Sequence, residues 1–103
     1  MSHDWSALAA RLKTASGPDP AIDVVIAEAF GMPMAAYSES AADCRRLVAR
    51  VLPDWRLHLG FDGAGGRPYA VVSNADIRVE AEAPTVPLAI LTALMELASL
   101  KTD

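Results

Sequence analysis

His58 is the side chain in this sequence best suited to acid–base chemistry, because an unperturbed imidazole changes its charge near neutral pH. The stretch 55–62 alternates apolar with polar residues, which indicates a strand that directs His58 and Arg56 to solvent. Glu80 or Glu82 of a later strand would lie across the sheet, where a histidine–carboxylate pair is a candidate acid–base or metal site. A solvated face with opposite charges in register is the commoner alternative.

Cys44 is the only cysteine in the sequence, so an internal disulfide and a cysteine-based zinc site are both excluded. It occurs in an apolar helical stripe, and no histidine lies near it in the sequence. Burial would raise the pKa of the thiol, so we expect a structural side chain rather than a nucleophile. His3, the other histidine, is expected in a frayed terminus. We therefore expect no catalytic residue, no metal ligand and no cofactor.

The glycine-rich stretch "GAGGRP" (63–68) invites comparison with a phosphate-binding loop, because glycines let backbone N–H groups approach an anion. It lacks the lysine and hydroxyl of such a loop, and a strand follows it where a phosphate site needs a helix N-terminus. We predict a hairpin loop.

A candidate basic patch consists of Arg45, Arg46, Arg50 and Arg56, beside which Trp55 could stack on a nucleic-acid base. A solvated helix face is the commoner arrangement for such arginines, and Trp55 is in phase with the inward residues of its strand. The net charge of −4, from 9 basic and 13 acidic residues, also argues against a general nucleic-acid binder, which needs a basic footprint.

The segment "GMPMAAYSES" (31–40) carries Met32, Met34 and Tyr37 between two predicted helices. Exposed apolar side chains in a loop often contact a partner, whereas the alternative is that they cover the end of the core; methionine suits both roles. The candidate partner-binding residues are Met32, Met34, Tyr37, Arg46, Arg50, Arg56 and His58.

The composition is that of one soluble globular domain, residues 1–103, with 52% hydrophobic and 21% charged residues. The N-terminus shows no signal-peptide pattern, and no apolar run approaches the roughly 18 residues of a membrane span. We expect a protein of the bacterial host cytoplasm with no membrane partner.

Three helices are predicted in the first half of the chain from the spacing of apolar residues, over 4–15, 19–30 and 40–52. Asp19 and Ser40 are the expected N-caps of the second and third helices, and Gly31 is placed to end the second. The apolar face of the second helix is expected to contain Ile22, Val25, Ile26, Ala29 and Phe30.

Three strands follow, because the apolar period changes from 3.6 to 2 after Pro53. The residues expected to face the core are Trp55, Leu57, Leu59, Phe61, Ile77, Val79 and Ala81. Short connections between consecutive strands imply an antiparallel meander. With a final helix after Thr85, its expected N-cap, the sequence predicts an α+β fold of the order α-α-α-β-β-β-α, a three-stranded meander sheet packed with about four helices.

The final helix, "TVPLAILTALMELASL" (85–100), is apolar on nearly every side after its first turn. Its only polar positions there are Thr92, Glu96 and Ser99, which we expect to form one exposed edge. Either the rest of the chain covers the helix, which would then lie at the centre of the fold, or a homodimer covers part of it.

Several stretches in their order resemble the phage ABA sandwich domain family: "ARLKTASGPDPAIDVVIAEAFG", "YSESAADCRRLV", "PDWRLHLG" and "AEAPTVPLAILTALMELA". The resemblance spans most of the chain. It implies a phage or prophage origin, a sandwich of helices and sheet, and no assigned catalytic residues. The family name suggests helices on both sides of the sheet, whereas the charged outward positions Arg56, His58, Arg78, Glu80 and Glu82 predict one open face.

We expect a small non-enzymatic phage or prophage accessory protein that binds another protein, in its sharper form an inhibitor of a host defence system such as an anti-CRISPR protein. The alternative is a nucleic-acid-associated accessory protein that uses the arginine cluster. An enzyme built around His58 is the third hypothesis.

Overall fold

The structure, a computed structural model, describes residues 5–61 and 66–101. His3 and residues 63–65 of the predicted hairpin loop lie outside the described residues. The element order confirms the predicted α+β fold. The elements are α1 (Trp5–Thr14), α2 (Pro20–Phe30), α3 (Ala41–Val51), β1 (Arg56–Phe61), β2 (Pro68–Ser73), β3 (Arg78–Glu82) and α4 (Val86–Lys101).

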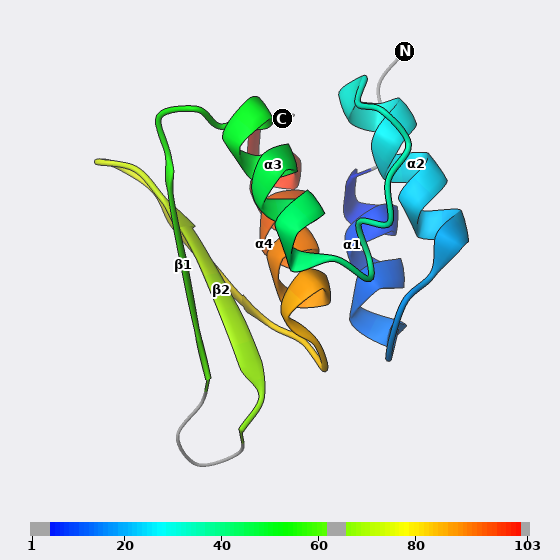
Figure 1. The fold of residues 1–103 in the computed structure, drawn as a ribbon. Helices are drawn as coiled ribbons and strands as arrows, with labels where there is room; N and C mark the ends of the chain where they lie inside the picture. The colour runs from blue at the N-terminus through cyan, green and yellow to red at the C-terminus, as the bar shows by residue number, and fades with distance from the viewer. Residues whose placement is uncertain (1–4, 62–65, 102–103) are drawn as a thin grey trace.

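The three strands form an antiparallel meander in the order β1-β2-β3, and the described helices all lie on one side of it (Figure 1). The side chains expected to point away from the helices, Arg56, His58, Arg78, Glu80 and Glu82, are all exposed. One face of the sheet is therefore open, as the charge pattern predicted. We call it the outer face.

Helix α4 is the centre of the molecule. It packs on β2 and β3 on one flank and against α1 and α3 on others, with α2 outermost (Figure 1). Residues 88–95 are all buried. Of the two alternatives for the last helix, the structure shows coverage by the rest of the chain, so the apolar sequence of α4 gives no reason to invoke a homodimer. Thr92 was wrongly expected at an exposed edge: it is 2% exposed, and its hydroxyl donates to the Leu88 carbonyl at 2.7 Å.

The helix ends follow the predicted caps. The Asp19 carboxylate accepts from the backbone N–H groups of Ala21 and Ile22, and Gly31 ends α2 with a left-handed φ of 62°. Such a φ favours glycine because other residues meet steric strain there. The Ser40 hydroxyl likewise accepts the Asp43 N–H in the first turn of α3, and the Thr85 hydroxyl accepts the Leu88 N–H in the first turn of α4.

Besides Thr92, the residues Phe61, Ile77 and Val25 depart from prediction. Phe61 is 66% exposed because it ends β1 at the sheet margin, and Ile77 precedes β3 in the turn, where it is also exposed. Val25 is exposed because the buried face of α2 is centred on Ile22 and Ile26 and takes in Asp23 instead. Leu57 and Leu59 pack against the core as expected, as does Trp55.

No helix in the described part of the chain is both long and apolar enough to cross a lipid bilayer.

Candidate functional site

A groove of about 440 Å³ lies between the end of α2 and the exposed side of α3. Its lining residues are Gly31, Met32, Pro33, Arg46, Ala49 and Arg50. We call it the α2–α3 groove. It brings together three of the seven residues predicted to bind a partner, Met32, Arg46 and Arg50, although they come from two separate stretches of the sequence.

The turn after α2 places Met32 in this groove. The left-handed Gly31 reverses the chain, and its N–H donates to the Glu28 carbonyl while the Met32 N–H donates to the Ala27 carbonyl at 2.9 Å. These two bonds satisfy carbonyls at the helix end, so they fix the direction in which the chain leaves α2. Met32 is half-buried against the core, and Met34, two residues on, is 63% exposed.

The two arginines of the groove differ in their partners. Arg46 is held on α3 by Asp43, with 2.9 Å between its Nη1 and the carboxylate Oδ1. Arg50 is exposed and forms no ion pair with the side chains that the structure describes. An unpaired guanidinium beside apolar atoms can bind a carboxylate through two parallel hydrogen bonds. Among the described residues that line the groove, Arg50 is therefore the arginine whose positive charge is open to a partner.

Tyr37 was a candidate contact residue, and the structure shows the alternative role. Its ring is buried, and its hydroxyl donates to the Pro33 carbonyl at 2.7 Å. Desolvation, followed by electrostatic interaction with Asp43, Cys44 and Asp23, raises the pKa of the Tyr37 hydroxyl. We call residues 31–40, between α2 and α3, the linker. The Tyr37 side chain packs under the linker's own backbone and holds it at Pro33.

A buried polar network, which the sequence analysis missed, fixes the linker to α2. The Asp23 carboxylate is buried and accepts the Ser38 backbone N–H at 2.7 Å. The Ser38 hydroxyl accepts from the Asp19 N–H at 2.7 Å and donates to the Asp19 carbonyl at 3.2 Å. The sequence does contain a signal for this network. Asp23 is an aspartate among apolar residues, four positions before the buried Ala27, and helical spacing puts both residues on one face.

Cys44 is buried, as predicted. Its thiol donates to the Tyr37 carbonyl at 2.8 Å and lies 3.7 Å from the Pro87 carbonyl, so it joins α3 to the linker and to the start of α4. Burial, with the charges of Asp23 and Asp43 as lesser causes, raises the pKa of the thiol to about 12. A thiol that stays protonated near neutral pH is a poor nucleophile.

Arg56 and His58 belong to another part of the surface, the outer face. His58 lies opposite Val71, and Val71 lies opposite Glu80, so His58 and Glu80 are two strand spacings apart, roughly 10 Å. The ring of His58 lies beside Tyr69, with 6.0 Å between centroids, and Glu80 binds Arg78 at 3.0 Å. The structure thus favours the solvated face over an acid–base pair.

The described residues contain no group of three or more histidine, cysteine, aspartate or glutamate side chains that could hold a metal ion. His58 and Cys44 are also on opposite sides of the sheet, because His58 is exposed on the outer face and Cys44 is buried on α3 among the helices, so they do not form a nucleophile–base pair.

Comparison of the chain with known protein families, with curated proteins and with solved structures found no match.

Proposed function

We propose that this protein is a small non-enzymatic phage or prophage accessory protein that binds another protein through the α2–α3 groove. The observation that carries the proposal is the meeting of Met32 in one groove with Arg50, which no described side chain pairs, next to the exposed Met34. Arginine is enriched among the residues that dominate binding energy, and methionine adapts its shape to a partner. The partner surface would present a carboxylate beside an apolar side chain.

In its sharper form, the proposal makes the partner a protein of a bacterial defence system such as a CRISPR effector. The small acidic chain and the resemblance of its motifs to phage ABA sandwich proteins support this class of partner. Binding is favoured over catalysis because His58 and Cys44 lie on opposite sides of the sheet. Arg56 is on the outer face, away from Arg46 and Arg50, so the basic patch considered for nucleic acid is divided.

The test is affinity purification of the tagged protein from a bacterial host with active CRISPR immunity, followed by native mass spectrometry. The groove variant is Met34→Asp with Arg50→Glu, and Arg56→Glu is the matched control, because it makes the same arginine-to-glutamate change on the outer face. Circular dichroism establishes that both variants fold. We expect one stoichiometric partner, retained by the control and bound at least about tenfold more weakly by the groove variant.

Equal binding of both variants, or recovery of no partner, would contradict the use of this groove. A gel-shift titration covers the alternative. The alternative predicts an affinity for nucleic acid that falls steeply with salt, and that Arg50→Glu and Arg56→Glu each weaken. That result would show that the protein binds the phosphate backbone and not a protein partner.

A further inference from the structure

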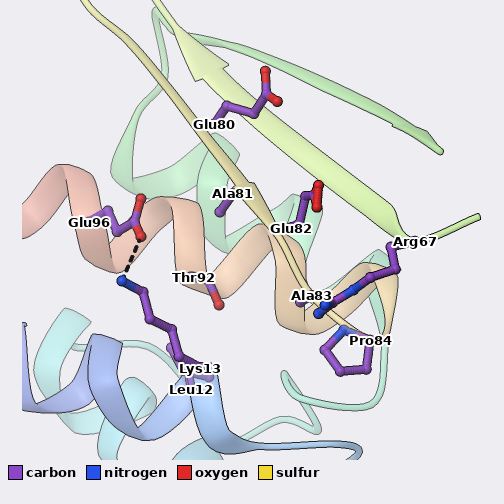
Figure 2. A pocket seen from close by; sticks show the side chains of 10 residues that line it. All are labelled: Leu12, Lys13, Arg67, Glu80, Ala81, Glu82, Ala83, Pro84, Thr92 and Glu96. Atoms are coloured by element: carbon purple, nitrogen blue, oxygen red, sulfur yellow. Dashed lines mark ion pairs between the residues drawn. The ribbon is translucent and has the colours of Figure 1, made fainter. Parts of the chain in front are cut away.

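A second groove follows the free edge of β3, where two hollows of about 340 and 450 Å³ adjoin. They share Lys13 of α1 and Glu96 of α4, whose charged groups are 3.4 Å apart (Figure 2). The first hollow runs beside residues 80–84, and the second beside Val79. We call the two together the β3-edge groove. Each hollow is within the size range of ligand pockets, roughly 300–1,000 Å³.

The backbone of β3 offers hydrogen-bonding groups to this groove. The Asn74 N–H donates to the Ile77 carbonyl, and the Ala83 N–H donates to the Pro68 carbonyl. Because bonded pairs alternate along an antiparallel ladder, the odd-numbered residues 77–83 are the ones bonded to β2. The backbone N–H and C=O groups of Arg78, Glu80 and Glu82 therefore point away from the sheet. None of them has a hydrogen-bond partner in the part of the chain that the structure describes.

We propose that the free edge of β3 takes up an extended segment of a partner protein as a fourth strand. A row of N–H and C=O groups along a strand edge is the complement of another extended backbone, which is how strand addition recognises peptides. Alternate side chains of the added strand would point inward to the two hollows, on either side of the Lys13–Glu96 pair. This surface is separate from the α2–α3 groove, so the inference stands apart from the proposed function.

The charges on β3 define the outward side chains of that segment. Its outer-face residues read Arg78, Glu80 and Glu82, and Arg78 already binds Glu80 at 3.0 Å. Opposite charges across neighbouring strands are stabilising and like charges are not. The added strand should therefore carry lysine or arginine opposite Glu80 and Glu82, alternating with small apolar residues that face Ala10 and the hollows.

A second copy of this chain fits the edge less well. Antiparallel pairing of two β3 strands about Glu80 would oppose the two copies of that residue. The inward residues Val79 and Ala81 are buried in their own core, so a second β3 would bring no side chain to fill either hollow. A separate peptide brings its own inward side chains.

The test uses NMR titration of the isotope-labelled protein with a synthetic peptide that alternates lysine and valine, against a peptide alternating glutamate and valine. Hydrogen exchange is then measured with the lysine peptide bound. We expect protection of the Arg78, Glu80 and Glu82 amides, with Val79 and Ala81 unchanged. Glu82→Lys should weaken binding about fivefold or more, and Glu28→Lys, the same change on exposed α2, should leave it unchanged.

Glu82 is exposed, so its replacement leaves the core intact, and unchanged amide shifts elsewhere will verify the fold. The proposal is overturned if neither peptide perturbs β3, if both bind equally, or if the protected amides are those of the odd-numbered residues. A concentration-dependent dimer that protects the same three amides without peptide would overturn it in favour of a second copy.

Discussion

The α2–α3 groove and the β3-edge groove are held in place by different forces. The first depends on a linker that a few buried polar contacts fix, from Asp23 to Ser38 and from Cys44 to Tyr37. The second depends on the sheet ladder and on α4 beneath it. The contacts proposed for the first groove are made by side chains, and those proposed for the second are made by backbone groups. Different substitutions should therefore disrupt the structure of the two grooves, although one core supports both.

The largest expected effect is on that common core. Leu91 is fully buried on α4, so Leu91→Ala should lower the free energy of unfolding by about 2–5 kcal/mol through lost burial and a residual cavity. Leu100→Ala, on an exposed residue of the same helix, should stay within about 0.5 kcal/mol. Urea denaturation measures both. A cost below about 1 kcal/mol for Leu91→Ala would mean that α4 is not the shared support.

Alkaline pH should lower stability through Cys44 and Tyr37, the two groups beside the linker whose pKa values are raised. The folded Cys44 thiol keeps its proton up to a pKa of about 12, whereas an unfolded thiol loses it near 9.0, so stability falls as pH rises between these values. The slope is about 1.4 kcal/mol per pH unit, which would total about 4 kcal/mol over that window. Tyr37, whose pKa is also raised, adds to the loss above pH 10.0, its ordinary value.

Urea midpoints at about pH 9 and about pH 10 test this dependence. Cys44→Ala should be less stable near neutral pH but should lose stability more slowly as pH rises, because the variant lacks the buried thiol whose raised pKa causes the loss. An equal slope in both proteins would place the alkaline sensitivity elsewhere.

Asp23 is the substitution that should separate the two grooves. Asp23→Ala leaves the buried Ser38 N–H without its acceptor, which should cost about 1–3 kcal/mol. Asp23→Asn keeps an acceptor oxygen and should recover part of that loss. We expect NMR shift changes in the linker and α2–α3 groove, with those of β3 unaltered. Equal perturbation of β3 would show that the linker and the sheet edge are coupled.

Sequence reasoning succeeded where local rules decide the structure. Asp19, Ser40 and Gly31 set helix boundaries through contacts within a few residues, and period-2 alternation found the strands and the open face. Sequence reasoning predicted less where the burial of a residue depends on segments far away in the chain. The sequence left two alternatives for what covers α4, because an apolar pattern does not identify the segment that packs on a helix. For α3 the polar residues of one face indicated directly which side is exposed.

The candidate site was only partly readable for the same reason. The sequence named Met32, Arg46 and Arg50, but only the fold shows that they share a groove and that Tyr37 lies beneath it. The β3-edge groove had no sequence signal, because its binding groups are backbone atoms whose direction depends on strand pairing.

The smallest expected effect concerns Lys13 and Glu96, the ion pair in the β3-edge groove. Lys13 is 62% exposed, so water screens the pair, and Lys13→Ala should change the free energy of unfolding by less than about 1 kcal/mol. A double-mutant cycle with Glu96→Gln should give a coupling below about 1 kcal/mol that decreases as salt is added. A coupling well above 1 kcal/mol would break the contrast between the grooves, because the sheet-edge surface would then depend on a specific polar contact as the linker does.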